Sequence, residues 1–184
     1  MVFEGYGIEL RPVTPSDLPS LRRWRNNPQI NQEMVDSSYI TPHQQRLWYE
    51  RIRERVDQAH WVVRHKEIRT GYANIKGEGP IDSQEKLEEV GFYVGDSPVR
   101  HVLLGYAIEM LLLDIAFEHL SASQIPGKIV KTNYSARKLA QQLGYCEFPK
   151  NKNFVGVVLD PADYKTAKKK FDRYFSNARC ELVG

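Results

Sequence analysis

Two basic residues, Arg100 and His101, stand between a predicted strand and a predicted helix. The strand covers residues 90–94, where apolar side chains occupy alternate positions. The helix begins at Gly105 and is apolar on nearly every face as far as Phe117, which predicts a core element. Unpaired N–H groups and the positive end of the dipole at a helix N-terminus favour a bound phosphate. The sequence therefore predicts a phosphate-binding loop, and a plain strand-to-helix connection with two exposed basic residues is the alternative.

Composition favours a single domain over residues 1–184, because a chain of this length with 41% hydrophobic residues can bury a core. The net charge is only +3 and the basic residues are spread along the chain, so we expect no nucleic-acid partner. The run Lys168 to Lys170 is expected on the solvated face of a terminal helix. The five histidines show no metal-ligand spacing, which predicts no metal site.

Cellular location follows from three features of the sequence. The two cysteines, Cys146 and Cys180, do not form a disulfide framework and fit a reduced compartment. The N-terminal residues lack the charged and apolar regions of a signal peptide, and no apolar run reaches the length of a membrane span. We therefore expect a soluble cytoplasmic protein without a membrane partner.

The first half of the chain predicts two helices and three strands around them. Thr14-Pro15 and Thr41-Pro42 are helix start signals, with Thr as N-cap and Pro at the first helical position. The first helix should stop at Asn27-Pro28. The second, amphipathic helix should end near Asp57. The predicted strands are 7–13, 61–64 and 70–76.

The second half adds strands and helices in alternation. We expect a strand at 128–131, a helix from Ser135 to Leu143 closed by Gly144, a strand at 154–159 and a last helix from Asp160-Pro161. An antiparallel meander followed by strand–helix units indicates an α/β or α+β fold around one mixed sheet.

The segment from Asn133 to Tyr145, NYSARKLAQQLGY, resembles the N-x-x-S/A-x-x-L-x-x-x-L-G-F/Y segment of the GNAT acyltransferase superfamily. Members of that family also have a strand, a glycine-rich loop headed by Arg or Gln, and a long helix, which corresponds here to residues 92–117. The resemblance covers most of the chain. It implies a mixed central sheet with an antiparallel N-terminal meander, flanked by helices.

The N-terminal half is similar to one branch of that family. The run from Leu21 to Ile30, LRRWRNNPQI, followed by Met34 and Trp48, resembles the acetyltransferases of amino-sugar nucleotides, including those of pseudaminic acid biosynthesis. A sister branch acetylates the N-termini of ribosomal proteins, and Gly105 to Glu109, GYAIE, resembles the G-Y-A-x-E of that group. The longer match favours the amino-sugar branch.

The resemblance implies acetyl transfer from acetyl-coenzyme A, as co-substrate, to a primary amine. Glu89 is the implied base, directly or through water, because it lies two residues before Gly91 on the strand that family members splay open beside the thioester; a solvated strand residue is the alternative. Tyr134 and Ser135 carry the nearest hydroxyls that could protonate the leaving thiolate. The implied cofactor-binding residues are Phe92, Tyr93, Val94, Arg100, His101, Val102, Leu103, Leu104, Gly105, Tyr106 and Asn133.

For the acceptor, a small-molecule amine, the resemblance points to the two predicted N-terminal helices. The residues are Trp24, Arg25, Asn26, Met34 and Trp48. Large aromatic residues at helical spacing usually pack inside, so a core role for both tryptophans is the alternative. Asn133 has a structural alternative as well, as the N-cap of the helix that follows it, with Ser135 in the first turn. The resemblance leaves a homodimer open.

Three residues depart from the family pattern. His101 and Leu103 replace two glycines of the R-G-x-G-x-G loop, where glycine lets the backbone approach the pyrophosphate. Ala140 stands where some branches carry a proton-donating tyrosine, and Gln45 where the amino-sugar branch often has histidine. These departures leave a binding protein of the same fold without turnover as an alternative to the enzyme.

Overall fold

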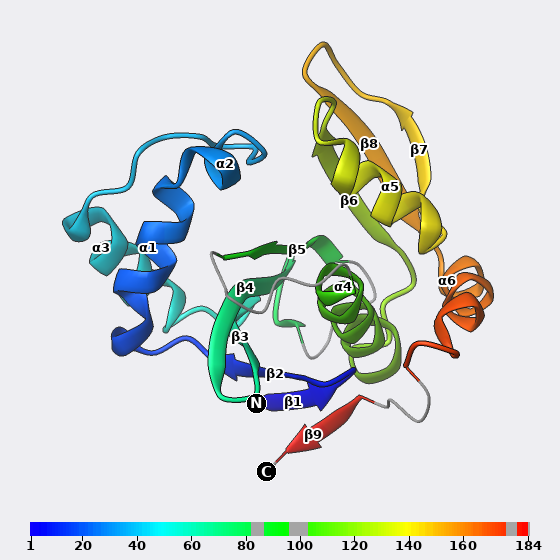
Figure 1. Ribbon diagram of the computed structural model, residues 1–184, viewed down its shortest axis with the longest axis horizontal. Helices are drawn as coiled ribbons and strands as arrows, with labels where there is room; N and C mark the ends of the chain where they lie inside the picture. The colour runs from blue at the N-terminus through cyan, green and yellow to red at the C-terminus, as the bar shows by residue number, and fades with distance from the viewer. Residues whose placement is uncertain (82–86, 96–102, 176–179, 184) are drawn as a thin grey trace.

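The computed structural model describes residues 1–81, 87–95, 103–175 and 180–183. Its larger sheet has six strands in the order β5-β4-β3-β2-β1-β9, and every neighbouring pair is antiparallel. Figure 1 shows this sheet at the centre of the molecule. Its strands are β1 (Val2–Gly5), β2 (Ile8–Pro12), β3 (Gln58–His65), β4 (Ile68–Gly77), β5 (Leu87–Val94) and β9 (Glu181–Val183).

A second, smaller sheet contains three antiparallel strands in the order β6-β8-β7. They are β6 (Ile125–Val130), β8 (Phe154–Leu159) and β7 (Cys146–Pro149). β6 contacts β5, the edge strand of the larger sheet, but the two strands belong to different sheets. Figure 1 shows the small sheet rising away from β5. The two sheets therefore part along one edge of β5.

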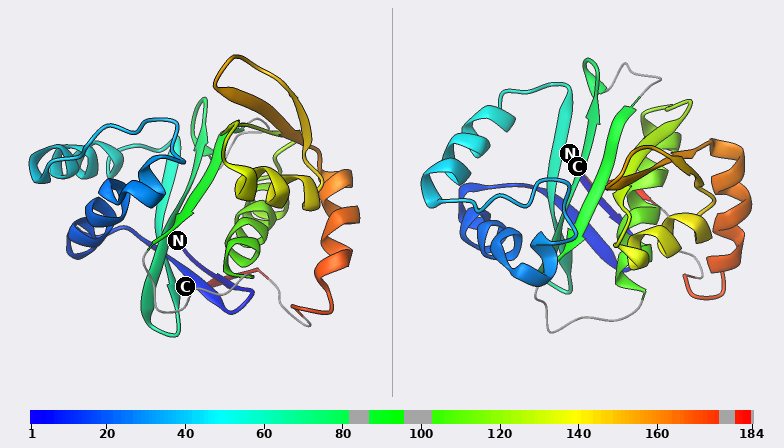
Figure 2. Two further views of the ribbon diagram at one scale, coloured as in Figure 1. Left: turned by 45° about the horizontal axis from the view of Figure 1, so that its top comes forward. Right: turned by 90° about the horizontal axis from the view of Figure 1, so that it is seen from above.

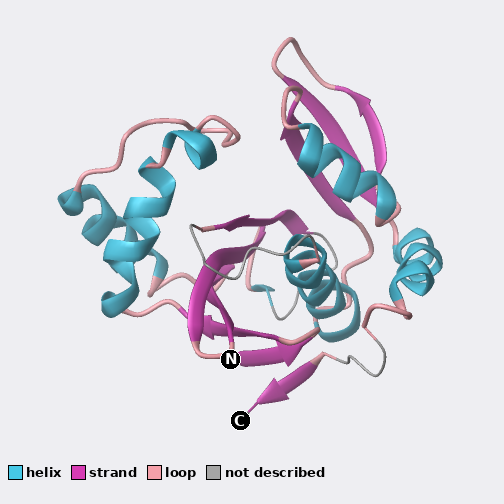
Figure 3. Cartoon of the chain, in the orientation of Figure 1, coloured by secondary structure: helices cyan, strands magenta, loops and turns pink. Residues whose placement is uncertain are grey.

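The helices form two groups on either side of the larger sheet (Figure 2). One group, shown in blue and cyan, contains a short 3-10 turn (Pro15–Asp17), α1 (Leu18–Asn26), α2 (Pro28–Asn31) and α3 (Pro42–Ile52). The other contains α4 (Leu104–Asp114) with its π-helical continuation (Ile115–His119), α5 (Tyr134–Gln142) and α6 (Pro161–Lys168), which continues as a 3-10 turn (Lys169–Phe171). Figure 3 shows the same two groups by secondary structure.

α4 is the core helix that its apolar sequence predicted. Every residue from Ala107 to Asp114 is buried, and α4 packs on β1, β4 and β5. A second hydrophobic cluster lies on the opposite face of the sheet, where Leu21 and Trp24 of α1 meet Val62 of β3 and Tyr93 of β5. β5 therefore has packed residues on both of its faces.

The predicted α/β fold with its antiparallel meander is confirmed, with corrections at several boundaries. The strand predicted at 7–13 is β2, and the structure adds β1 before it; Tyr6 and Gly7 turn the chain between the two strands with positive φ angles of 55° and 76°. The helix predicted to end near Asp57 ends at Ile52. Leu47 of this helix is 43% exposed, and Val56, beyond the helix end, is 69% exposed. Within the ranges described, no helix is long and apolar enough to cross a membrane.

Candidate active site

A β-bulge in β5 sets the direction of the Glu89 side chain. Gly77 of β4 is opposite Leu87, but Lys76 is opposite Glu89, so β5 uses one more residue than β4 at this point. Leu87 is 3% exposed and lies in the main core against α4. The extra residue shifts by one position the alternation of β5 side chains between the two faces of the sheet. Glu89 therefore points to the face opposite Leu87, on the side of α1 and α3.

Both hydrogen bonds of the Glu89 carboxylate go to one oxygen. Oε1 accepts from Asn74 Nδ2 and from Lys76 Nζ, each at 2.9 Å. Burial raises the pKa of Glu89, but the bonds and charge of Lys76 and the Asn74 bond outweigh burial and leave the pKa below its ordinary value. Glu89 is therefore ionised at neutral pH. No described residue bonds to its second oxygen, Oε2.

A neutral histidine lies beside this carboxylate on the same face of the sheet. Gln58 Oε1 can only accept, so His60 Nε2 donates to it at 3.0 Å and His60 Nδ1 accepts from the Tyr72 hydroxyl at 2.6 Å. Burial, with the nearby Lys76 ammonium, lowers the pKa of His60 to about 4. The Trp48 ring packs edge-on against His60, with a centroid distance of 5.6 Å. His60 is thus held uncharged in one tautomer.

The C-terminal end of α1 brings a basic group to this face. Arg25 Nη2 donates to the Asp36 carbonyl at 2.8 Å, while Nη1 is buried without a hydrogen-bond partner among the described residues. Burial raises the pKa of the Tyr72 and Tyr93 hydroxyls, and the positive charge of Arg25 opposes that increase at both. The guanidinium therefore lies close to these two tyrosines.

The other residues predicted for the acceptor have more structural roles. Trp24 is 2% exposed and covers Gly95, whose position could not carry a side chain because an added Cβ would lie 2.3 Å from the Trp24 ring. Asn26 bonds with both amide groups to the backbone of Ile40, each at 2.8 Å, and so holds the loop before α3. Met34 is a partly buried member of the same hydrophobic cluster.

The N-terminus of α4 is not capped by a side chain, in contrast to α3, where Thr41 and Gln44 form a capping box. Among the described residues, the first α4 bond runs from Ala107 N to Leu103 O, and the amides of residues 104–106 have no partner there. Leu103 has φ −85° and ψ −9°, so its backbone does not require glycine. Amides at the start of a helix fit a phosphate group. Arg100, His101 and Val102, predicted for the same loop, lie outside the described residues.

Side chains in the first turn of α4 pack against neighbouring helices. An added Cβ on Gly105 would lie 3.3 Å from the Leu139 side chain, so a small residue lets α5 approach α4. The Tyr106 hydroxyl bonds to Gln142, and its ring packs on Phe171 at 5.0 Å. Tyr106 therefore has only its backbone amide to offer a cofactor.

β5 presents free backbone groups along the edge where the two sheets part. Gly95 N donates to Thr70 O at 2.8 Å, so the groups of Gly95 face β4. Because antiparallel bonding alternates, those of Tyr93 also face β4, while Phe92 and Val94 turn theirs to the open edge. Of the three residues predicted to bind the pantetheine arm, two can do so through their amides.

The candidate proton donors lie at the start of α5. Asn133 Oδ1 accepts from Ala136 N at 2.9 Å, so Asn133 is the N-cap of this helix. Tyr134 is 73% exposed, and Ser135 is exposed as well. Tyr134 also lines a cavity of about 540 Å³ between α5 and β7, together with Ala140 and Tyr145. Across the described ranges, no contact joins Tyr134 or Ser135 to Glu89.

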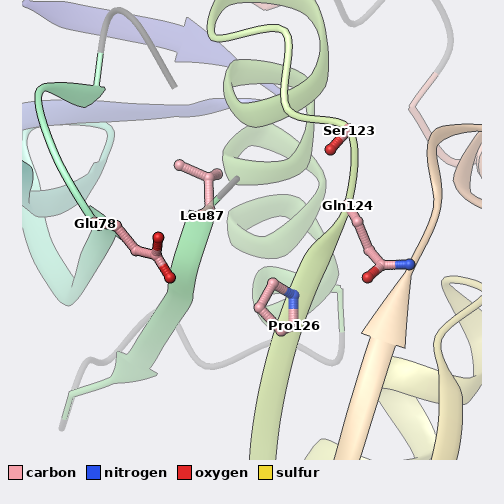
Figure 4. Close-up of a pocket in the computed structure, with 5 residues that line it drawn as sticks. All are labelled: Glu78, Leu87, Ser123, Gln124 and Pro126. Atoms are coloured by element: carbon pink, nitrogen blue, oxygen red, sulfur yellow. The ribbon is translucent and has the colours of Figure 1, made fainter. Parts of the chain in front are cut away.

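Another cavity, of about 400 Å³, lies where β5 and β6 begin. Figure 4 shows Glu78 and Leu87 on one side of it and Gln124 and Pro126 on the other. Among the described residues, its lining has one carboxylate, from Glu78, and no lysine, arginine or histidine. We therefore place the chemistry at Glu89 rather than in this cavity.

Sequence reasoning missed the partners of Glu89. Asn74 and Lys76 occupy alternate positions of a strand that was predicted at 70–76, and His60 precedes another predicted strand. The alternation of polar residues was visible in the sequence, but the pairing register that brings them to Glu89 was not.

The comparisons with known proteins concern the family and the fold. A model of the acetyltransferase (GNAT) domain matches residues 8–145. The chain is similar in structure to apo FdhC, a nucleotide-linked sugar GNAT, with a TM-score of 0.74 and 15% identity over 96% of this chain and 99% of that one. It is also similar to the Campylobacter jejuni N-acetyltransferase PseH in complex with acetyl coenzyme A, with a TM-score of 0.61 and 16% identity over 84% and 99% of the two chains.

A third similar structure is a domain from Methanocaldococcus jannaschii, with a TM-score of 0.68 and 18% identity over 85% of this chain and 99% of that one. No curated protein matches the sequence. At these identities the solved structures establish the fold alone. The domain match, however, spans 138 of the 184 residues. The chain therefore belongs to the acetyltransferase (GNAT) domain family and is an acyltransferase.

Proposed function

We propose that this protein transfers the acetyl group of acetyl-coenzyme A to the primary amine of an amino-sugar nucleotide. FdhC is a nucleotide-linked sugar GNAT, and PseH was solved with acetyl coenzyme A, which motivates both substrates. The observation that carries the proposal is the positive charge around Glu89.

Two lysines lie close to the Glu89 carboxylate, and Arg25 lies near Tyr72 and Tyr93. Lys76 bonds to Glu89 at 2.9 Å, and Lys128 of β6 is close enough for its charge to lower the pKa of Glu89. Arg25 is at the same face and has a buried nitrogen without a hydrogen-bond partner among the residues that the structure describes. A carboxylate suits an amine, and surrounding cations suit an anion. An acceptor with an amine and a diphosphate satisfies both, whereas a peptide N-terminus brings no such anion.

The residues present fit acetyl-coenzyme A, which supplies the activated acetyl thioester. The amides of Leu104, Gly105 and Tyr106 can hold the pyrophosphate at the uncapped start of α4. The outward backbone groups of Phe92 and Val94 can hold the pantetheine arm. The start of α4 is on the opposite face of the sheet from the Glu89 side chain. The cofactor and the acceptor would therefore approach β5 from opposite faces of the sheet.

Glu89 Oε2 is the proposed proton acceptor for the amine, directly or through water. Because Glu89 is ionised at neutral pH, it attracts an ammonium group before any proton moves. Its lowered pKa makes it a weak base, so the proton passes on to solvent. The hydroxyls of Tyr134 and Ser135 are the proposed donors to the leaving thiolate, and both are exposed at the start of α5.

Release of free thiol from acetyl-coenzyme A tests the proposal. The acceptors are amino sugars linked to a nucleotide, the same amino sugars without the nucleotide, and a peptide with a free N-terminus. We expect kcat/KM to be highest for the linked sugars, by about tenfold or more, since one charge-assisted bond to phosphate contributes about 1.5–3 kcal/mol.

Two variants of equal charge change separate specific binding from general attraction. Lys128→Gln should raise KM for the linked sugar and leave KM for the unlinked sugar nearly unchanged. Lys165→Gln, on the exposed side of α6, is the matched control and should change neither. Faster turnover of the peptide than of every linked sugar would move the assignment to the branch that acetylates ribosomal protein N-termini.

A further inference from the structure

The two donors that hold the Glu89 side chain both come from β4, the strand paired with β5. We propose that Lys76 and Asn74 are positioning residues for the acetyl transfer, which fix the Glu89 carboxylate through one oxygen and leave the other for the amine. The inference rests on the proposed function in one respect, that Glu89 accepts the proton of the amine. It adds roles for two residues that would act through Glu89.

The register of the sheet places both donors next to the carboxylate. Lys76 is the cross-strand partner of Glu89, and Asn74 is the partner of Gly91, two residues further along β5. Side chains two residues apart on a strand point to the same face, so both donors lie on the face of Glu89. The bulge is necessary for this arrangement, because without the extra residue Lys76 would be opposite Glu88.

The two donors stand on an inner strand of the larger sheet and the carboxylate on an edge strand. β4 is bonded on both sides, to β3 and to β5, whereas β5 is the last strand of this sheet. Ala73 and Ile75, which alternate with the two donors, are 0% exposed and belong to the main core. Asn74 itself is 5% exposed. Donors that are held by packed neighbours can fix the side chain to which they bond, so β4 sets the position of Glu89.

Both donors bond to the same oxygen of the carboxylate. Lys76 Nζ and Asn74 Nδ2 each lie 2.9 Å from Glu89 Oε1. Because a carboxylate is planar, two bonds that fix Oε1 also fix the direction of Oε2. An oxygen with a fixed direction can meet the N–H group of an acceptor, or a water that carries its proton, without first being ordered.

The charge of Lys76 has a second effect on the carboxylate. Burial raises the pKa of Glu89, and the bond and the charge of Lys76 are the largest effects that lower it, followed by the Asn74 bond. Without Lys76, burial would favour the protonated form, which can neither attract an ammonium group nor accept its proton. Lys76 therefore provides both orientation and charge, and Asn74 provides orientation.

The other ionisable groups near this carboxylate do not replace Lys76. Lys128 of β6 acts by charge, and no bond joins it to the carboxylate in the part of the chain that the structure describes. Burial lowers the pKa of His60 to about 4 and raises the pKa of Tyr72, so both are neutral at pH 7. Two charged residues near His60 bond to each other, Arg55 and Asp57.

Carbon-13 NMR of the Glu89 carboxyl carbon tests the charge effect without a substrate, with Glu89→Gln used to assign the signal. The carboxyl itself has to be observed, because His60 titrates at low pH as well. In Lys76→Met the midpoint should move to higher pH, since burial is then opposed by weaker effects. Asn74→Leu removes a bond but no charge and should move it less. Lys76→Arg should keep the wild-type midpoint, and so should the matched control Lys165→Met on the exposed side of α6.

Steady-state kinetics with a saturating amino-sugar nucleotide test the positioning effect. Lys76→Met should lower kcat about tenfold or more, because a displaced base loses part of a contribution that is typically 10² to 10⁴. In the Glu89→Gln background the same substitution should change kcat by less than about twofold, since Lys76 acts through Glu89. Lys76→Arg should recover most of kcat. The dissociation constant of acetyl-coenzyme A should be the same in all these variants.

Three outcomes would overturn the inference. They are an unchanged Glu89 midpoint in Lys76→Met, an equal loss of kcat in the wild-type and Glu89→Gln backgrounds, and full activity of Glu89→Gln itself. Failure of the proposed function gives a different result, in which wild type acetylates no amino-sugar nucleotide. The NMR titration then still tests the charge effect of Lys76, and the amine that is acetylated replaces the sugar in the kinetics.

Discussion

Two carboxylates paired with lysines, Asp114 in α4 and Glu89 in β5, show how a structural group differs from a candidate functional one. Asp114 is completely buried. It accepts from Lys168 at 2.6 Å, from the Tyr164 hydroxyl at 2.7 Å and from the Tyr6 hydroxyl. Both of its oxygens are bonded, so it ties α4 to α6 and to the turn between β1 and β2.

Glu89 has the same lysine partner type but only one bonded oxygen. Its side chain is 45% exposed. A buried carboxylate with all its bonds made has nothing left for a ligand, and its removal leaves unpaired donors inside the protein. A carboxylate with a free oxygen on an open face can bind a substrate. The comparison assigns stability to Asp114 and chemistry to Glu89.

The largest expected effect is on the rate of Glu89→Gln. The substitution keeps the side-chain size but removes the charge and the proton acceptor, so kcat/KM should fall by about 10² to 10⁴. The free energy of unfolding should change by less than about 1 kcal/mol, because the Lys76 pair is partly exposed. Thiol release and urea unfolding measure the two quantities. Full activity of the variant would assign proton transfer to another residue or to bulk water.

Asp114→Asn should show the opposite pattern. Loss of the charge leaves Lys168 without its buried partner, and we expect about 3 kcal/mol of destabilisation in urea unfolding. At a temperature where the variant is still folded, kcat and both KM values should match wild type. A large loss of kcat in folded protein would show that the two carboxylates are not separated in role.

A third carboxylate, Glu109, is buried, and its one bond among the described residues comes from the Tyr145 hydroxyl at 2.8 Å. Burial raises the pKa of Glu109 to about 7, and the Tyr145 bond only partly opposes it. The folded state therefore binds a proton that the unfolded state has released between about pH 4.5 and 7. Stability falls as pH rises through this range, by on the order of 2–3 kcal/mol above pH 7.

Glu109→Gln removes that cost and keeps an oxygen for Tyr145. The variant should be more stable than wild type by on the order of 2 kcal/mol at pH 8, with little gain at pH 5. Urea unfolding at the two pH values measures the difference. Equal effects of the substitution at both pH values would contradict the raised pKa.

The sequence predicted well those elements whose signals are local. The start signals at Thr14-Pro15 and Thr41-Pro42 correspond to helix starts, and the apolar run from Gly105 is the buried α4. Two of the strands that were missed, β7 and β9, lack such signals. All four residues of β7 are exposed, so no buried face alternates along it, and β9 has three residues. A strand of this kind exists because of its partner, which the sequence alone does not show.

The candidate site was predictable only in part, for a related reason. Glu89 and the start of α4 came from the family pattern, and the N-cap role of Asn133 came from residue type and position. The bulge at Glu88 and the pairing of β4 with β5 bring Asn74 and Lys76 to Glu89. These are long-range features, and a shift of one residue in register would place the same side chains in the core.

The smallest expected effect is that of Leu103→Gly, which restores the glycine of the family loop at the N-cap of α4. Because Leu103 already has an ordinary right-handed backbone, the amides of residues 104–106 take their positions from the helix and not from residue 103. Glycine is tolerated at an N-cap, so stability should change by less than about 1 kcal/mol. The dissociation constant of acetyl-coenzyme A should change by less than about threefold, or about 0.7 kcal/mol, in titration calorimetry.

Binding tighter by tenfold would show that the Leu103 side chain obstructs the pyrophosphate, and binding weaker by tenfold would show that it packs the loop. Either result would mean that cofactor binding depends on the side chain at position 103. The acceptor side of β5, in contrast, is already formed.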